Sequence, residues 1–396
     1  MHRITALLLV LLAASLCVDA QSTQPERPTA PVPLVSAPAH DPVVHQDGSV
    51  TFDLVMPHAE VVEVSVEGFS KPFAMTRNAS AGEPAHWTYT LPPLAPEYYS
   101  YSFQVDGVDI IDPHNTVVKT SAFSVQSIFL VPGHQLWETR EVPHGVIHHY
   151  EYTSAIVQRT SSYYVYTPPG FDPKSKQSYP VLYLLHGYSD DPSAWTSMGK
   201  ANVILDNLIA EGKARPMIVV MPLGYGDMDM ISRGWIAWRD PQLVQRNFHR
   251  FSEALYQEVM PRVAGEYPMI SASREDHAIA GLSMGGAETL LVGLNHPDAF
   301  AWIGAFSAGG IGSTGFPEDF PHLTPADAPT FNAGNRLLWI SCGTEDGLLE
   351  PNRLLISWLR DQGLHPNAIE TSGMHAWMVW RDNLSHFVPL LFQPKS

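Results

Sequence analysis

The feature that most constrains the fold of this chain is a pentapeptide, Gly-Leu-Ser-Met-Gly, at residues 281–285. Apolar residues 278–280 precede it, and a helix-forming run, 287–292, follows it. This context predicts a strand, a sharp turn and a helix in succession. A serine at such a turn is held in strained backbone geometry, and its hydroxyl projects from the edge of a sheet. The pattern therefore predicts that Ser283 is a nucleophile.

A carboxylate is expected downstream of this serine. A serine hydroxyl is a weak nucleophile at neutral pH, so it needs a base within hydrogen-bond reach and an acid that orients this base. Asp346 follows the apolar run 337–342, in a turn at the predicted carboxyl end of a strand, and is the expected acid. Glu345 is the alternative acid. A further interpretation is that this turn only caps the following helix.

The expected base is His375, in the glycine-containing loop 372–377 beyond the last predicted strand. It comes after the acid, which is the chain order Ser, Asp, His of α/β-hydrolases. The chain contains 18 histidines, so position rather than residue type selects this one. His386 is the rival, but it falls within an apparent final helix, 381–391.

Two backbone N–H groups are expected to form an oxyanion hole. Attack on an ester carbonyl places negative charge on its oxygen, and donors must already point there. One donor is expected from Met284, the residue after the nucleophile. The other is expected from Tyr188, because residues 181–187 read as five apolar residues followed by His-Gly, and the glycine permits close approach.

The chain divides into regions of different pattern. Residues 40–132 show short alternating strands, clearest at 99–105, which predict a β-sandwich. Residues 133–145 read as a connector. From residue 146 to 396 strands alternate with helices, which predicts a mostly parallel sheet covered on both faces. The strands expected in this second region are 162–166, 180–185, 217–221, 277–280, 302–306, 337–342 and 368–370, with a long helix at 243–264.

The first residues suggest export. Residues 1–20 have a basic start, an apolar core too short to span a bilayer and a small-residue exit, which predict a cleaved signal peptide. Residues 21–39 are rich in Pro, Thr, Ser and Ala and read as a linker. We therefore expect a secreted or periplasmic protein. A lipid-attachment role for Cys17 is disfavoured, because Leu16 stands where a small residue is needed, and Cys342 is expected to be a buried thiol.

Composition excludes several function classes. The 396 residues suffice for two sizeable cores. The formal net charge of −17 argues against nucleic acid and against an anionic membrane surface as partners. The sequence has no His-Glu-x-x-His motif, no paired Cys-x-x-Cys and no glycine-rich phosphate loop after a strand, and the adjacent His148 and His149 are a weak signal. We expect no metal and no organic cofactor.

Residues from about 146 to the end resemble carbohydrate esterase family one, the esterase D-like group that includes feruloyl esterases and acetyl xylan esterases. The stretches that carry the resemblance are 163–171, 183–187, 281–286, 343–346 and 373–380, in the family's order. The resemblance implies an α/β-hydrolase fold. It also implies the triad Ser283, Asp346 and His375, with Tyr188 and Met284 as oxyanion donors.

The N-terminal region resembles early-set immunoglobulin-like modules related to carbohydrate-binding family forty-eight, at residues 47–52, 99–107 and 112–115. The resemblance implies a small all-β immunoglobulin-like sandwich before the esterase domain, as in two-domain feruloyl esterases. Such modules often precede sugar-active enzymes. Glycan binding by Trp87, Tyr98 and Tyr101, and a structural or substrate-framing role, both remain open.

The resemblance implies a secreted serine esterase that acts on plant cell-wall polysaccharide, most simply a feruloyl esterase that releases ferulic acid from arabinoxylan. Planar aromatic acids need aromatic or apolar walls, and the loop 224–238 is the expected pocket edge or lid. Candidate walls, any of which could also be core, are Trp195, Trp235, Trp238 and Trp377. The alternatives are an acetyl xylan esterase, an enterochelin-type siderophore esterase, an acyltransferase and a non-catalytic glycan-binding protein.

Overall fold

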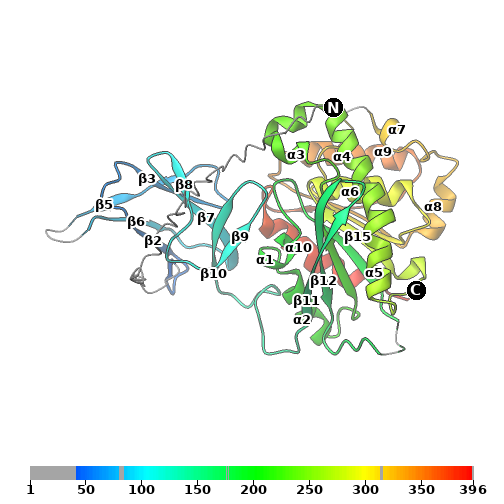
Figure 1. Cartoon of the computed structure of the whole chain (residues 1–396), viewed down its shortest axis with the longest axis horizontal. Coiled ribbons are helices and arrows are strands. Elements are labelled where there is room, and N and C mark those ends of the chain that lie inside the picture. The colour runs from blue at the N-terminus through cyan, green and yellow to red at the C-terminus, as the bar shows by residue number, and fades with distance from the viewer. Residues whose placement is uncertain (1–41, 80–83, 175, 177, 313–314, 395–396) are drawn as a thin grey trace, which may run out of the picture. The chain divides into compact units, whose positions relative to one another are not determined.

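The computed structural model describes residues 42–79, 84–174, 176, 178–312 and 315–394. The predicted signal peptide and linker, with Cys17, lie outside these residues. Within the described chain a β-rich N-terminal region is followed by a region in which strands and helices alternate (Figure 1).

The N-terminal region contains a four-stranded sheet, in the order β1-β2-β6-β5, and a six-stranded sheet, in the order β4-β3-β7-β10-β9 with β8 on β7. Pairing within both sheets is antiparallel. The strands are β1 (Val43–Val44), β2 (Val50–Val55), β3 (Val62–Val66), β4 (Phe73–Ala74), β5 (Thr76–Asn78), β6 (His86–Leu91), β7 (Glu97–Val105), β8 (Val108–Ile110), β9 (Val118–Thr120) and β10 (Val125–Val131).

The two N-terminal sheets share one hydrophobic core. Alternate residues of β2 are buried, as the period of a half-buried strand requires. The ring of Phe52 on β2 lies 5.2 Å from that of Tyr101 on β7 and 5.6 Å from that of Phe129 on β10, between centroids. Trp87 and Tyr101 are buried in this core, so neither can form the exposed platform that glycan binding would need. Tyr98 is partly buried under the ammonium group of Lys200.

The second region contains an eight-stranded mixed sheet in the order β11-β12-β14-β13-β15-β16-β17-β18. Pairing is antiparallel from β11 to β14 and parallel from β14 to β18. The expectation of a mostly parallel sheet therefore holds for its larger part, and β11 is an additional edge strand. The strands are β11 (Val146–Ser154), β12 (Arg159–Thr167), β13 (Val181–Leu185), β14 (Ile218–Pro222), β15 (His277–Leu282), β16 (Trp302–Phe306), β17 (Leu337–Gly343) and β18 (Asn367–Thr371).

Helices cover both faces of this sheet (Figure 1). In β13, Leu182 and Leu184 join the core that α2 and α10 complete, while Tyr183 and Leu185 join the core that α4, α5, α6 and α9 complete. A strand buried on both faces explains the continuous apolar run. The helices are α1 (Ala194–Ser197), α2 (Ala201–Ala210), α3 (Asp229–Ser232), α4 (Pro241–Ala254), α5 (Met260–Glu266), α6 (Met284–Asn295), α7 (Phe316–Asp319), α8 (Ala328–Gly334), α9 (Leu349–Asp361) and α10 (Trp377–Phe387), with short 3₁₀ segments η1 (Gly234–Arg239), η3 (Arg274–Asp276) and η4 (Val388–Leu390).

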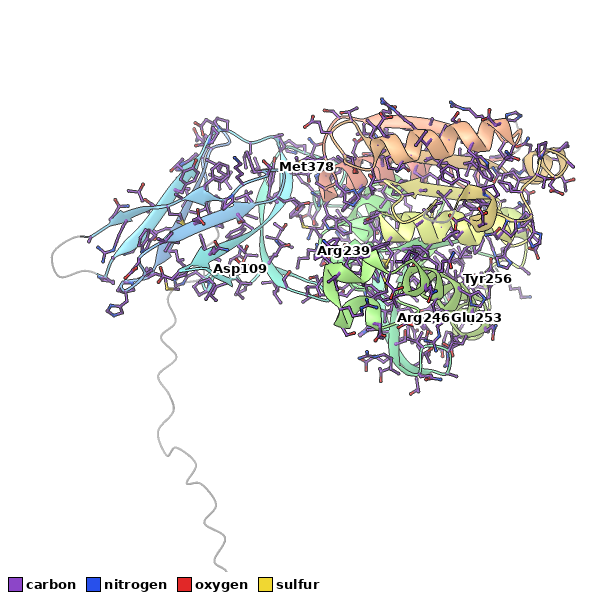
Figure 2. All side chains as sticks on the ribbon, turned by 90° about the horizontal axis from the view of Figure 1, so that it is seen from above. Asp109, Arg239, Arg246, Glu253, Tyr256 and Met378 are labelled. Carbon is purple, nitrogen blue, oxygen red and sulfur yellow. The ribbon has the colours of Figure 1, made fainter. Side chains whose placement is uncertain are left out.

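The long helix predicted at 243–264 is present, but it has three parts. The side chain of Asp240 accepts the N–H of Leu243 (3.2 Å), and Pro241 occupies the first turn, so α4 has a well-formed start. A π-helical segment, η2 (Leu255–Val259), separates α4 from α5. Pro261 cannot continue an α-helical ladder, and this wider segment ends two residues before it. Figure 2 labels Glu253 and Tyr256, which lie near this junction.

Helix α10 contacts the N-terminal region through buried groups. Arg381 is fully buried and forms an ion pair with Glu97 (2.8 Å). It also donates to the carbonyl of Tyr98 (2.8 Å). Burial raises the pKa of Glu97 to about 6 although the Arg381 charge opposes this shift. Met378 on the same helix, labelled in Figure 2, packs against the cores of both regions.

Candidate active site

Ser283 occupies the turn between β15 and α6. Its backbone lies at φ 52° and ψ −116°, which residues with a side chain rarely adopt. The N–H of Ser283 donates to the carbonyl of Phe306 (2.9 Å), and the N–H of Gly309 donates to the carbonyl of Ser283 (3.0 Å). The strand, sharp turn and helix predicted around Ser283 are therefore present, at the carboxyl edge of the parallel strands.

Two glycines of the pentapeptide are required by close contacts. A Cβ atom on Gly281 would lie 2.4 Å from the carbonyl oxygen of Gly285. A Cβ atom on Gly285 would lie 2.5 Å from the carbonyl oxygen of His186. Both distances are far below van der Waals contact, so only glycine fits. The start of α6 consequently packs directly against the backbone of the segment that follows β13.

The structure brings Ser283, His375 and Asp346 together. The Ser283 hydroxyl lies 3.0 Å from Nε2 of His375, and Nδ1 of His375 lies 2.7 Å from a carboxylate oxygen of Asp346. In the tautomer that donates Nδ1–H to Asp346, Nε2 can accept the serine proton. Asp346 is buried, whereas the alternative acid Glu345 is exposed, and the rival histidine His386 is exposed on α10.

Asp346 is held in its ionised form. Burial alone would raise its pKa, but hydrogen bonds from His375 and from the N–H of Leu348 (2.8 Å), with the Ser307 hydroxyl, keep the pKa of Asp346 below its ordinary value. Cys342, at the end of β17, is a buried free thiol, as expected. Burial and the nearby Asp346 charge raise its pKa to about 12.

Ser307 is a further residue of the site and was not predicted from the sequence. It is fully buried, its φ is 49°, and its N–H donates to the carbonyl of Ser341 (2.6 Å). Its hydroxyl contacts Asp346 and accepts the indole N–H of Trp380 (3.2 Å). The Trp380 ring also lies edge-on to the imidazole of His375, with centroids 4.9 Å apart. A signal existed: Ser307 directly follows the strand predicted at 302–306.

The segment that follows β13, residues 186–191, is termed the oxyanion loop. A Cβ atom on Gly187 would lie 3.3 Å from that of Ser283, so this backbone passes directly beside the serine. Tyr188 comes next in the loop, and Met284 is the first residue of α6. A first helical residue has no carbonyl partner one turn earlier. Within the described ranges neither N–H donates to a backbone carbonyl, so both predicted donors remain without a backbone partner.

His186 fixes the start of the oxyanion loop. It is buried, its Nδ1 lies 2.8 Å from the carbonyl oxygen of Gly187, and its Nε2 accepts the N–H of Gly224 (2.9 Å). Burial lowers the pKa of His186, which favours the neutral ring that these bonds require. Glu288 of α6 is also buried here, beside Gly224, and burial raises its pKa well above the ordinary value.

The four predicted pocket tryptophans divide into two pairs. Trp195 and Trp377 are buried in the core, where their rings pack edge to face at 5.2 Å, so neither presents an exposed wall. Trp195 lies on α1 and Trp377 on α10, and both helices pack on the same face of the sheet. Neighbouring core residues therefore cover both rings. Trp235 and Trp238 instead pack against Tyr188 of the oxyanion loop, at 4.8 and 5.2 Å between centroids. Trp235 is 68% exposed.

Histidines 148 and 149 pair with neighbours in the sheet. His148 lies 3.3 Å from the Thr167 hydroxyl, and His149 stacks on Tyr164. In the part of the chain that the structure describes, His, Cys, Asp and Glu side chains form no cluster of three or more that could hold a metal ion. Over the same part, every helix is too short or too polar to span a membrane.

The mixed sheet with helices on both faces, the serine at its sharp turn and the hydrogen-bonded Ser-His-Asp arrangement are those of the α/β-hydrolase class. The family model Esterase, described as "Putative esterase", matches residues 154–391. The chain belongs to this esterase family, which confirms the esterase relationship predicted from the sequence.

Three known proteins show how far the similarity extends. An endo-1,4-beta-xylanase/feruloyl esterase of Xylanibacter ruminicola is 28% identical over 377 residues, which cover 93% of this chain and 48% of that protein. The chain thus spans about half the length of this curated relative. A ferulic acid esterase structure from Anaeromyces mucronatus has a TM-score of 0.54 at 22% identity, covering 66% of this chain and 96% of that one. The enterobactin esterase of Shigella flexneri has a TM-score of 0.62 at 18% identity, covering 87% of this chain and 93% of that one.

Proposed function

We propose that this protein is a serine esterase that releases ferulic acid from feruloylated plant cell-wall polysaccharide, most simply arabinoxylan. The observation that carries the proposal is the hydrogen-bonded arrangement of Ser283, His375 and Asp346 beside two available backbone donors. The relative named as a xylanase/feruloyl esterase aligns with 93% of the chain. Its name supports ferulate as the acyl group and a xylan as the polymer.

The geometry supports a two-step acyl transfer. The Ser283 oxygen attacks the ester carbonyl carbon while Nε2 of His375 takes the serine proton, and Asp346 stabilises the imidazolium that forms. The carbonyl oxygen becomes an anion that the N–H groups of Tyr188 and Met284 bind. The bond between the acyl carbon and the sugar oxygen then breaks while His375 protonates that oxygen, which leaves the acyl group on Ser283. Water repeats the sequence on the acyl-enzyme and releases the carboxylic acid.

The surroundings of Tyr188 suit a planar aromatic acid. The Trp235 and Trp238 rings both pack edge-on against its ring, and the exposed Trp235 offers apolar area beside the oxyanion loop. Trp238 also reaches the strand-end turn beside the serine: a Cβ atom on Gly310 would lie 2.7 Å from its ring. We assign these two tryptophans, rather than Trp195 and Trp377, to the feruloyl pocket.

A second candidate function is hydrolysis of a siderophore-type trilactone. The enterobactin esterase structure matches the fold over both regions, whereas the ferulic acid esterase structure matches 66% of the chain. Identity of 18% supports the fold alone. We favour the feruloyl ester because the relative that aligns with 93% of the chain by sequence carries that name.

The test compares activity on methyl ferulate, acetylated xylan and a cyclic trilactone, with Ser283→Ala as the control for each. We expect the highest kcat/KM on methyl ferulate, and a loss of roughly 10⁴-fold or more in the Ser283→Ala variant. Circular dichroism should show an unchanged fold. Turnover that persists in the variant would contradict the serine mechanism, and a preference for the trilactone would move the assignment to the second candidate.

We also propose the domain boundaries and location that the sequence suggested. The two N-terminal sheets with their shared core support an immunoglobulin-like sandwich over residues 40–132, followed by a connector, 133–145, and an esterase domain, 146–396. The basic and apolar start of the chain supports cleavage after residue 20 and a secreted or periplasmic protein. N-terminal sequencing of the exported protein tests this, since a retained leader would contradict it.

A further inference from the structure

The oxyanion loop is held from outside the α/β sheet. Residues of β9 and of the turn that joins it to β10, residues 119–123, bond to successive residues of the oxyanion loop. These residues belong to the N-terminal region. The loop that offers one of the two oxyanion donors therefore has anchors in a part of the chain that contributes none of the three residues Ser283, His375 and Asp346.

The strongest anchor is a buried ion pair. Nζ of Lys119 lies 2.8 Å from a carboxylate oxygen of Asp190, and the two side chains are 11% and 5% exposed. Burial raises the pKa of Asp190, and the Lys119 charge opposes this shift. The same ammonium group lies 5.6 Å from the ring centroid of Trp377, two residues beyond His375, within cation–π distance. Removal of one partner from such a pair leaves an uncompensated buried charge.

A backbone hydrogen bond adds a second anchor. The N–H of Ala122 donates to the carbonyl of Ser189 (2.6 Å). Ser189 has a φ of 75°, a left-handed conformation that costs free energy in a residue with a side chain. The donor turn is itself rigid, because Ser121 and Ser124 are joined by backbone and side-chain hydrogen bonds. A fixed donor opposite Ser189 stabilises this strained conformation one residue after Tyr188.

Two contacts complete the set. The hydroxyl of Thr120 donates to a carboxylate oxygen of Asp191 (2.8 Å). The ring of Phe123 packs edge-on to that of Tyr188, with centroids 5.4 Å apart. The anchors thus reach Tyr188 and the three residues that follow it.

We infer that Lys119, with the 121–124 turn, is a positioning element for the oxyanion hole: it holds the N–H of Tyr188 at the distance from Ser283 that the reaction requires. The inference rests on the proposed function, since it deepens the role of the same site. Its consequence is that the N-terminal region is needed for the chemical step even on a substrate too small to touch it.

The test substitutes Lys119→Met and, as a matched control, Lys200→Met. Lys200 is also a lysine at the boundary with the N-terminal region, but it stacks on Tyr98 instead of pairing with the oxyanion loop. The substrate is p-nitrophenyl acetate, and active sites are counted with a fluorophosphonate probe, so partial unfolding does not enter kcat. For Lys119→Met we expect kcat to fall about 10- to 100-fold, somewhat less than the loss of a whole donor. KM should change less than about threefold, because the oxyanion contact forms only in the transition state.

Three further readouts decide the inference. Phosphonylation of Ser283 should slow in Lys119→Met, because the phosphoryl oxygen must enter the same hole, and Lys119→Arg should recover most of kcat. Lys200→Met should keep kcat within about twofold. Equal losses in both methionine variants, or a lower Tm in Lys119→Met with unchanged kcat, would overturn the inference. If the wild type hydrolyses no ester, the proposed function fails, and the ratio of phosphonylation rates still decides the positioning role.

Discussion

The two halves of the candidate site are supported in different ways. The proton-transfer half, Ser283, His375 and Asp346, lies on the turn between β15 and α6, the turn after β17 and the loop before α10, which are all elements of the α/β region. The oxyanion half, which includes Tyr188, is held partly by Lys119 and the 121–124 turn of the N-terminal region. The N-terminal region therefore contacts the oxyanion loop directly, whereas its contacts on the side of His375 are with Trp377 and helix α10, beyond the histidine.

This difference suggests why the two regions occur together. The position of the Tyr188 donor depends on direct contacts across the boundary between them. His375 is connected to this boundary less directly, through Trp377, whose N–H donates to Glu67 (2.8 Å), and through helix α10. We expect a small displacement of Lys119 and the 121–124 turn to change transition-state stabilisation more than it changes the Ser283–His375–Asp346 hydrogen bonds, because these residues contact the oxyanion loop directly. The comparison predicts that variants of the two halves differ in the size of the kinetic loss and in its pH dependence.

The largest expected loss beyond that of the nucleophile is for Asp346→Asn. An amide cannot stabilise the imidazolium and favours the wrong tautomer of His375, so we expect kcat to fall roughly 10⁴-fold. Glu345→Gln is the matched control one residue away. Glu345 is exposed, and its substitution should change kcat within about twofold. Steady-state kinetics on both variants check this. A loss in Asp346→Asn no larger than that of Lys119→Met would remove the distinction between the two halves.

The proton-transfer half was the part most accessible from sequence. Its residues lie in short local patterns: the pentapeptide, the strand-end turn that holds Asp346 and the loop that holds His375. Each pattern is fixed by backbone conformations that few sequences allow, such as the left-handed φ at Ser283. The strands at 162–166, 277–280 and 302–306 were similarly clear, because apolar runs between turn residues specify them.

The anchoring of the oxyanion half could not be predicted, because it depends on contacts between distant segments. Nothing near Lys119 in sequence indicates that it pairs with Asp190. Strand β10 and the 121–124 turn were likewise not predicted. The exposure of the tryptophans could not be predicted from sequence for the same reason. Trp195 and Trp235 both follow a strand, but tertiary packing buries Trp195 and leaves Trp235 exposed.

A smaller loss is expected for Ser307→Ala, which tests whether the proton-transfer half has support of its own. The Ser307 hydroxyl lowers the pKa of Asp346, and a hydrogen bond to a charged group contributes roughly 1.5–3 kcal/mol. If part of this contribution is felt in the transition state, kcat falls about tenfold. Alanine keeps the Cβ atom, so the strained backbone at residue 307 is unchanged.

The pH dependence of unfolding gives Ser307→Ala an independent readout. A carboxyl whose pKa is lowered in the folded state stabilises the protein above its unfolded-state pKa of about 3.8, and this stabilisation is lost as pH falls through the folded pKa. The variant should therefore be less stable than the wild type at pH 7, and the difference should shrink below about pH 4. Urea unfolding across this range measures it. A stability difference between variant and wild type that does not depend on pH would indicate lost packing. It would contradict the proposal that the Ser307 hydroxyl stabilises the ionised form of Asp346.

The smallest kinetic effect is expected for Glu288→Gln, which lies behind the oxyanion half. Burial raises the pKa of Glu288 well above its ordinary value, which favours the neutral carboxyl, and the amide of glutamine has nearly the same shape. We expect kcat within about threefold of the wild type.

The two proteins should diverge in stability instead. A raised folded pKa means that the wild type loses stability as pH rises above the unfolded-state value of about 4.5, whereas glutamine has no proton to lose. The free energy of unfolding of Glu288→Gln, measured by urea titration, should thus rise relative to the wild type as pH rises above about 4.5. A tenfold loss of kcat at pH 7 would contradict the expectation for kcat. It would mean that the reaction depends on the ionised carboxylate of Glu288, a negative charge behind the oxyanion half.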